Sequence, residues 1–445
     1  MAVPENPSST LFLGIRMMFY VITPNETSFK REEEVPEYVQ QATPFFLGML
    51  IIETLVNYAK SQPGFRINDG LTSVSAGIFS RLPMMLRRSL EVSAYIYVWN
   101  NYRIWEMPWD SPWTWWLTFL GVDFAYYWVH RFSHEVNIMW AAHQAHHSSE
   151  DYNLSTALRQ SVMNQYLSWL FYLPMALVIP PSVFAVHTQF NLIYQFWIHT
   201  ETVGNLGPLE FVINTPSHHR VHHGRNPYCI DKNYGGTLII WDRIFGTFAP
   251  ESEKVVYGLT HPIDTFDPFW VQFHHYTHIW KTFWATPGIS NKLSVIFKGP
   301  GWGPGKPRLG LPEELPEITG KEVPYNPALP ASMQAYALMH FLLIVGIYHE
   351  MFASKAVLSE TVLVLNIIYV LLTLTAIGFI SNQKCGMTLL EPVRCIVFLV
   401  FHRLGYLKLP SPVLSLPSEV ICLLTVCYWM RNMVKKMVLG KKKHH

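Results

Sequence analysis

The sequence reads HRFSH at residues 130–134, HQAHH at 143–147 and HRVHH at 219–223, and these three histidine clusters decide the fold. Residues three and four apart lie on one face of an α-helix, so His130 and His134 are predicted to point the same way. The same spacing predicts that the histidines of each later cluster share a face. The eight cluster histidines are His130, His134, His143, His146, His147, His219, His222 and His223.

These histidines indicate a metal centre. A neutral imidazole offers one nitrogen lone pair and is the commonest metal-binding side chain. One transition metal takes about four to six ligands, so eight imidazoles predict two metal ions. A single histidine would be an ordinary core or surface residue, whereas three clusters at helical spacing are typical of a ligand set.

The residue types in and near the clusters indicate which metal is bound. Imidazole suits zinc, copper, iron and nickel alike. None of the three clusters contains cysteine, and Cys229 falls six residues beyond the third, which disfavours a thiolate zinc site. A polyhistidine site in a membrane protein favours oxygen chemistry at iron.

The composition predicts a polytopic membrane protein that has the lipid bilayer as a partner. Of the 445 residues, 50% are hydrophobic and only 14% are charged, whereas about 25% are charged in a typical soluble domain. With 16 Trp, 22 Tyr and 27 Phe, the chain has enough aromatic residues for belts at both membrane interfaces. A net charge of +2 gives no case for nucleic acid, and five cysteines without a C-x-x-C pair indicate neither a disulfide framework nor a zinc ribbon.

Apolar runs on both sides of the clusters predict an all-α fold, in which polytopic membrane helices are joined to a cytosolic histidine-rich helical cap that holds the dimetal site. A spanning helix needs about 17–25 apolar residues. Residues 67–86 are only weakly apolar and are interpreted as an interfacial or re-entrant piece, and Arg394 interrupts the run at 388–401. The runs are 43–59, 89–102, 113–129, 334–352, 361–380, 388–401 and 413–429.

Six regions are predicted along the chain. They are a polar N-terminal segment (1–42), an N-terminal membrane region (43–112), the core with the three histidine motifs (113–250), the remainder of the polar cap (251–332), C-terminal membrane helices (333–432) and a basic cytosolic tail (433–445).

The motifs H-x-x-x-H, H-x-x-H-H and H-x-x-H-H, in this order beside membrane helices, resemble those of the fatty acid hydroxylase and sterol desaturase superfamily. The segment after the third cluster adds to the match, with DKNYGG at residues 231–236 and WDRIFGT at 241–247. The superfamily motifs cover about residues 113–250. Within the superfamily, the chain most closely resembles the glyceryl-ether monooxygenases, which depend on tetrahydrobiopterin.

His199 is a ninth candidate metal ligand. Two apolar stretches between residues 161 and 199, which flank Pro180-Pro181, predict a helical hairpin that ends at His199. Superfamily relatives have an additional ligand histidine at about this position. His274, His275 and His278 also have helical spacing, but they fall outside the family motifs, so an interfacial helix is the favoured interpretation.

Two carboxylates are candidates for supporting the site. Glu135 follows His134 and is the predicted catalytic residue, because it could orient a ligand or relay protons. Asp123 lies inside the apolar run 113–129. An intramembrane carboxylate is a functional candidate by default, and a supporting role for a nearby histidine is an equal alternative for Asp123.

The resemblance implies an oxidoreductase with two iron ions that hydroxylates the alkyl carbon beside the ether bond of an ether lipid. O2 is the implied co-substrate, tetrahydrobiopterin is the electron donor, and the hemiacetal product breaks down to a fatty aldehyde and a free glycerol derivative. One alternative is a cytochrome b5-dependent sterol or fatty acyl hydroxylase or desaturase, although no His-Pro-Gly-Gly haem motif marks a fused b5 domain. The other is a membrane metal transporter, which is disfavoured because the clusters fall at helix exits and in the cap. The sequence does not specify an oligomeric state.

Basic residues predict the orientation. Arg81, Arg87 and Arg88 precede the run at 89–102 and are expected on the cytosolic side. The chain ends in KKKHH, in which the lysines third and fourth from the end resemble the dilysine retrieval signal of endoplasmic reticulum membrane proteins. We therefore expect an endoplasmic reticulum protein with the cap and the C-terminus in the cytosol, which requires an even number of spans after the cap.

Overall fold

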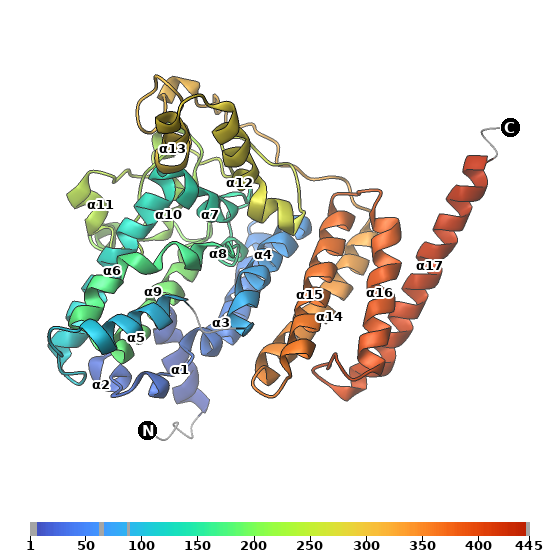
Figure 1. Ribbon diagram of the computed structural model, residues 1–445, viewed down its shortest axis with the longest axis horizontal. Helices are drawn as coiled ribbons and strands as arrows, with labels where there is room; N and C mark the ends of the chain where they lie inside the picture. Colours follow the sequence, from blue (N-terminus) through green and yellow to red (C-terminus); the bar gives the residue numbers. More distant parts are fainter. Residues whose placement is uncertain (1–6, 62–65, 87–89, 442–445) are drawn as a thin grey trace. The chain divides into compact units, whose positions relative to one another are not determined.

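The computed structural model describes residues 7–61, 66–86 and 90–441, and in this part of the chain the regular secondary structure is helical (Figure 1). Two isolated bridges, Ile213 with Leu238 and Gly224 with Tyr257, are the only β pairings among these residues. The predicted all-α class is therefore confirmed. The chain forms two compact units, the first made of residues 1–65, 88–263 and 273–324 and the second of residues 66–87, 264–272 and 325–445.

The first unit contains all three histidine clusters. Its α-helices are α1 (Pro7–Met18), α2 (Pro24–Thr27), α3 (Tyr38–Ala59), α5 (Leu90–Tyr102), α6 (Pro112–Glu135), α7 (Asn137–His147), α8 (Leu154–Ala157), α9 (Pro181–Trp197), α10 (Pro216–His223), α11 (Ile240–Phe245), most of α12 (Pro268–Ala285) and α13 (Ile289–Phe297). Short 3₁₀ helices lie at Glu32–Glu34, Asn164–Tyr166, Trp169–Phe171, Leu173–Leu177, Gly207–Phe211, Pro227–Cys229 and Pro312–Glu314.

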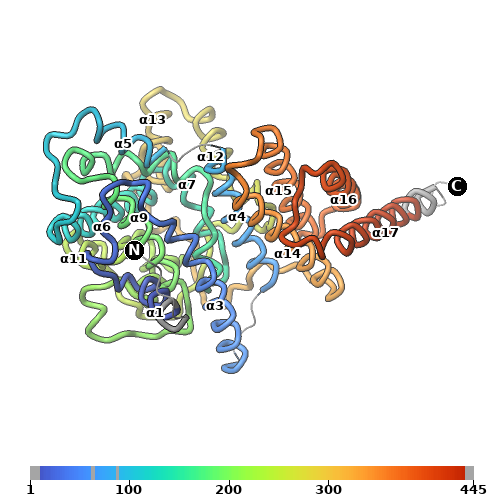
Figure 2. Tube along the Cα trace, turned by 90° about the horizontal axis from the view of Figure 1, so that it is seen from below, coloured from blue at the N-terminus to red at the C-terminus, as the bar shows by residue number. Residues whose placement is uncertain are grey.

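Helix α6 is the central element of this unit. It begins with Pro112 at its first position, where the missing amide proton costs nothing. Trp115 of α6 packs with Phe190 and Ile193 of α9 in one buried cluster, and Figures 1 and 2 both place the two helices side by side. Helix α6 ends at Glu135, and after the extended residue Val136 the chain turns directly into α7.

The predicted helical hairpin between residues 161 and 199 is only half correct. Its second half is the regular helix α9. Its first half consists of three 3₁₀ turns, at Asn164–Tyr166, Trp169–Phe171 and Leu173–Leu177. Pro174 lies in the third turn, where it lacks an amide donor, and the next two prolines start α9. Apolar character alone therefore overestimated the helix length.

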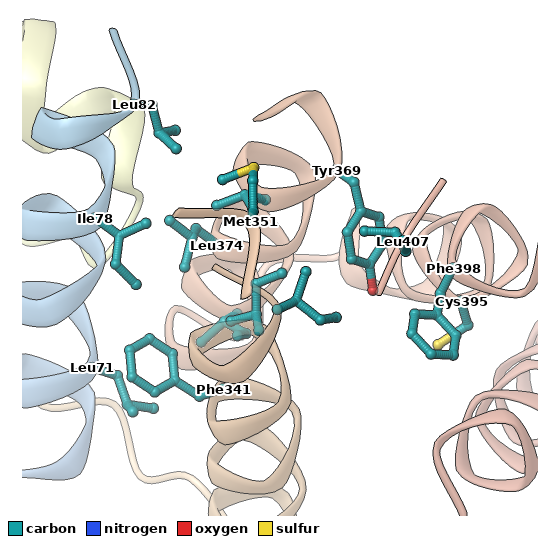
Figure 3. Packing of buried hydrophobic residues seen from close by; sticks show 14 of the residues in the cluster. Leu71, Ile78, Leu82, Phe341, Met351, Tyr369, Leu374, Cys395, Phe398 and Leu407 are labelled. Carbon is teal, nitrogen blue, oxygen red and sulfur yellow. The ribbon is translucent and has the colours of Figure 1, made fainter. Parts of the chain in front are cut away.

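The second unit is a bundle around one apolar core. Leu71 and Ile78 of α4 face Phe341 of α14, and Leu374 of α15 and Phe398 of α16 belong to the same core (Figure 3). Residues 67–86, expected to be an interfacial or re-entrant piece, form one continuous and largely buried helix. The helices of this unit are α4 (Ile67–Leu86), the start of α12, α14 (Ala331–Ser354), α15 (Glu360–Ser381), α16 (Met387–Arg403) and α17 (Ser415–Lys441), with a 3₁₀ turn at Pro412–Leu414.

Four helical stretches in the described residues are long and apolar enough to cross a membrane, which confirms a multi-pass membrane protein. The stretch that contains α3 exposes Ile51, Ile52 and Leu55, each 61% exposed, as a lipid-facing helix would. Arg87, Arg88 and the last four residues, on which the orientation depends, lie outside the described residues. The four stretches are Glu32–Ala59, Ala331–Ser354, Glu360–Ser381 and Pro412–Lys435.

Candidate metal centre

The structure brings all nine predicted ligand histidines together in two buried groups. Helices α6, α7 and α10 supply eight of them, and His199 follows the end of α9. Within each group, one ring nitrogen of every member lies within 4.8 Å of the others. The five-histidine group is His130, His134, His143, His147 and His222, and the four-histidine group is His146, His199, His219 and His223.

This grouping corrects the expectation that the histidines of each later cluster share one face. On α7, His143 and His147 belong to the five-histidine group and His146 to the other. On α10 the assignment is reversed, because His219 and His223 belong to the four-histidine group and His222 does not. At about 100° per residue, positions i+3 and i+4 lie about 100° apart around a helix. Each of these two helices therefore lies between the two groups and contributes histidines to both.

Adjacent imidazoles in each group approach through their Nε2 atoms. In the five-histidine group the Nε2 atom of His143 lies 3.1 Å from those of His130 and His147. In the four-histidine group the Nε2 atom of His199 lies 3.2 Å from that of His146 and 3.1 Å from that of His219. Two ligands at roughly 2.1 Å from one metal are separated by roughly 3 Å, so these spacings fit shared ions.

Backbone carbonyls determine which ring nitrogen faces the centre. The Nδ1 atom of His146 donates to the carbonyl of Arg159 at 2.9 Å, and that of His199 donates to the carbonyl of Gln195 at 2.7 Å. Both Nε2 atoms are therefore bare lone pairs, and they face each other at 3.2 Å. Two facing lone pairs repel each other unless a cation lies between them. The tautomers thus fit a bound metal.

Burial keeps these imidazoles neutral. It lowers the pKa of all nine below the usual histidine value, to about 3 for His130 and to about 4 for His146. A neutral imidazole keeps the lone pair that binds a metal. Among the described residues, the buried Nε2 atoms of His134 and His223 have no hydrogen-bond partner, which fits ligand atoms.

The turn at residues 231–242, which contains the DKNYGG sequence, supports the five-histidine group. The carbonyl of Tyr234 accepts a hydrogen bond from His130 Nδ1 at 2.8 Å, and that of Lys232 accepts one from His222 Nδ1 at 2.9 Å. Asp242 in turn accepts from the backbone amides of Tyr234 and Gly235 at 2.8 and 2.7 Å. The sequence similarity located this turn, and only the structure connects it to the histidines.

Asp123 supports the same turn and contacts none of the nine histidines among its described hydrogen bonds. Its carboxylate accepts from the amides of Thr237 and Leu238 at 2.7 and 3.0 Å. It also accepts from Trp241 Nε1 at 2.9 Å and from Asn191 Nδ2 at 2.8 Å. Asp123 of α6 therefore links α6 and α9 to the turn by hydrogen bonds. It supports the histidines indirectly, through this turn.

Glu135 lies at the edge of the site. Its Oε1 atom accepts from Arg131 Nε at 2.8 Å, and the two side chains are 17% and 24% exposed. Arg131 also donates to the hydroxyl of Tyr127 at 3.1 Å. Sequence reasoning missed the nearby Asp231, whose Oδ1 atom lies 3.9 Å from Nδ1 of His134. Asp231 is the first residue of the DKNYGG segment, so the family motif was the feature of the sequence that could have identified it.

The histidines of α12 belong to neither histidine group in the part of the chain that the structure describes. His275 Nε2 is paired with Asn137 Oδ1 at 2.7 Å, and His278 is exposed. Neither these two nor His274 belongs to a histidine group. The predicted ligand set therefore contains the nine histidines and none from α12.

Comparison with known proteins identifies the family of the chain. Residues 115–247 match the fatty acid hydroxylase family, and residues 333–420 match the alkylglycerol monooxygenase C-terminal domain. Alkylglycerol monooxygenase of Xenopus tropicalis is 64% identical over 97% of this chain and 96% of its own length. The chain belongs to the alkylglycerol monooxygenase family. Its human relative is 59% identical over 95% of this chain and 96% of its own length, and that of Danio rerio is 56% identical over the full length of both. No solved structure matches.

The family assignment agrees with the two units. All nine histidines of this alkylglycerol monooxygenase family member lie within the fatty acid hydroxylase segment. The family's C-terminal domain corresponds to α14, α15, α16 and the start of α17 in the second unit.

Proposed function

We propose that this chain is a membrane-bound di-iron monooxygenase that hydroxylates the alkyl carbon next to the ether oxygen of alkylglycerols and their lysophospholipid relatives. One atom of O2 becomes the new hydroxyl group and the other becomes water, with two electrons and two protons taken up. The product is a hemiacetal, which breaks down to a fatty aldehyde and a free glycerol derivative. The names of the full-length relatives support the substrate class.

The observation that carries the proposal is the pair of bare Nε2 atoms of His146 and His199, 3.2 Å apart, beside a second group with the same spacing. Bound iron would supply oxygen activation, and tetrahydrobiopterin would supply the two electrons. The nine buried imidazoles would hold the two ions at fixed positions, and their burial would exclude water from the oxidant. Glu135 is proposed to orient its neighbour His134 or to relay protons.

The proposed location is the endoplasmic reticulum membrane, with the histidine groups and the C-terminus on the cytosolic side. A diffusible pterin would then reach the centre from the cytosol. A protein donor would need an exposed docking face, and such faces usually carry charges of one sign. The cap sequence has mixed charge and no strong patch of a single sign. The residues are Lys254, Lys281, Lys292 and Lys298 against Glu251, Glu253, Asp264 and Asp267.

A donor exchange on one preparation tests the proposal. The full-length protein, reconstituted in lipid nanodiscs with iron, receives an alkylglycerol and O2, and fatty aldehyde is measured. We expect aldehyde with tetrahydrobiopterin and none with reduced cytochrome b5. Metal analysis of the same preparation should find about two irons per chain.

The same preparation can also refute the proposal. Oxidation of a sterol or an acyl chain with cytochrome b5, without aldehyde in the presence of the pterin, would replace it with the b5-dependent alternative. Movement of metal across sealed vesicles without oxygen consumption would favour a transporter.

A further inference from the structure

Glu53 is the only charged residue of α3, and it is buried although apolar side chains next to it in the helix are exposed. Its exposed fraction is 6%, while Ile52 and Leu55 are each 61% exposed. A carboxylate in a candidate membrane span is costly unless it is bound, and such residues are by default functional candidates. The contacts of Glu53 therefore indicate its role.

Glu53 joins α3 to two separate segments of the first unit. Its Oε2 atom accepts a hydrogen bond from the backbone amide of Leu154 at 2.9 Å. Its Oε1 atom accepts a hydrogen bond from the hydroxyl of Thr200. Both bonds are buried, so water does not compete for them.

The first segment leads to His146. Leu154 is the first residue of α8, and the carbonyl of Thr156 in this helix accepts from the amide of Arg159 at 3.0 Å. The carbonyl of Arg159 accepts the Nδ1 proton of His146 at 2.9 Å. Fixing α8 therefore fixes the acceptor that sets the tautomer of His146.

The second segment leads to His199 and His219. Thr200 directly follows His199, and its carbonyl accepts from Arg220 Nη1 at 3.0 Å. Arg220 directly follows His219, and Glu251 holds its guanidinium through two bonds of 2.7 Å. Thr200 is thus the junction at which α3 and α10 meet the His199 segment.

We propose that Glu53 is a positioning residue for the four-histidine group, acting through Leu154 and Thr200 without touching the metal. The five-histidine group has a different support, since the carbonyls of Tyr234 and Lys232 hold His130 and His222. The membrane helix α3 therefore controls one of the two ions. This inference rests on the two-metal centre of the proposed function.

Iron content tests the selectivity. In Glu53→Ala, made in the full-length protein in nanodiscs, we expect iron to fall from about two to about one per chain, with the remaining iron released to a chelator at the wild-type rate. Glu53→Gln keeps one acceptor oxygen and should retain more iron than Glu53→Ala. Thr54→Val is the matched control, because Thr54 is exposed and, among the described residues, its hydroxyl donates to Leu50 of its own helix. It should retain about two irons.

Thr200→Val provides a second variant, which leaves Glu53 in place. It removes the bond from the Thr200 hydroxyl to Glu53, together with the contacts of that hydroxyl with the hydroxyl and the amide of Thr202 at 2.9 and 3.1 Å. It should release one of the two irons faster than wild type does, and it decides the matter if Glu53→Ala does not fold. Wild-type protein without two irons would refute the proposed function itself. Two irons with wild-type release rates in both Glu53→Ala and Thr200→Val would overturn the role of Glu53 alone. Loss of both irons together with a lower Tm would indicate a merely structural role and would also overturn it.

Discussion

His134 differs from His130 and His222 of its group in what its Nδ1 atom faces. A backbone carbonyl accepts from Nδ1 of His130 at 2.8 Å, whereas the Nδ1 atom of His134 faces the carboxylate of Asp231 at 3.9 Å. Asp231 has a φ of 56°, in the left-handed region that Asp and Asn tolerate better than other residues with a side chain.

Asp231→Asn is predicted to weaken metal binding without disturbing the backbone. Asn tolerates the same φ. The change therefore removes the negative charge beside His134 and replaces one carboxylate oxygen by an amide nitrogen. Loss of such a partner typically costs about 10–100-fold in metal affinity. Competition of the purified protein with a chelator of known iron affinity measures the effect. An unchanged affinity would show that the carboxylate does not support His134.

His146→Ala is predicted to abolish aldehyde formation while leaving membrane insertion intact. The variant removes one of four ligands of its group and leaves an unpaired lone pair on His199. His278→Ala is the matched control, because His278 is exposed on α12 and belongs to neither group. Turnover by His146→Ala near that of the control, at equal expression, would contradict the ligand assignment.

The role of Glu135 can be separated from that of its ion pair with Arg131. Glu135→Gln is predicted to lower turnover by about 10–100-fold or more. Arg131→Gln breaks the same 2.8 Å pair but keeps the carboxylate. If Glu135 orients His134 or relays protons directly, Arg131→Gln should be clearly milder in kcat. Equal losses in the two variants would assign the effect to the ion pair instead.

At the level of secondary structure, the turn at residues 231–242 leaves no room for added volume at Gly235. A Cβ atom on Gly235 would lie 2.5 Å from the carbonyl oxygen of Leu238, which is backbone and cannot rotate away. Gly235→Ala is therefore predicted to displace the turn, destabilise the fold by about 1–3 kcal/mol, and lower the Tm and the iron content together. Gly204→Ala is the control, because its Cβ would meet no atom within 4 Å. A wild-type Tm for Gly235→Ala would contradict this prediction.

Helical periodicity predicted the ligands but not their grouping. Spacing alone identified eight histidines, and the superfamily resemblance added His199. The sequence could not show that α7 and α10 lie between two groups, because their relative placement depends on packing between residues far apart in the chain. The same reason explains why Glu53 and Asp231 were missed, since each reaches its partners across about a hundred residues or more. The 3₁₀ turns before α9 were missed because apolar composition does not distinguish them from a buried helix.

At the scale of the whole molecule, the orientation of the C-terminus depends on α16. This helix has 17 residues, so it is shorter than the four candidate spans, and Arg394 interrupts its apolar run. The structure pairs Arg394 with Glu391 at 2.7 Å, and both side chains are at most 1% exposed. The hydroxyl of Tyr336 on α14 also donates to Glu391. The charges are thus enclosed in the bundle, and the apolar residues at the surface of α16 are Leu389, Val393, Ile396 and Val400, 60%, 41%, 47% and 47% exposed.

We therefore predict that α16 spans the membrane, since a paired charge inside the bundle with an apolar outer face is tolerated in lipid. Four spans would then follow the cap, and an even number returns the chain to the side from which it started. Sealed vesicles can test this with one protease site inserted at residues 317–322 of the cap and one epitope tag at the C-terminus. Protease added outside the vesicles should cut the cap site and remove the tag before the vesicles are permeabilised. Cleavage of the cap site together with protection of the tag would mean that only three spans follow the cap, and α16 would then lie at the membrane surface instead.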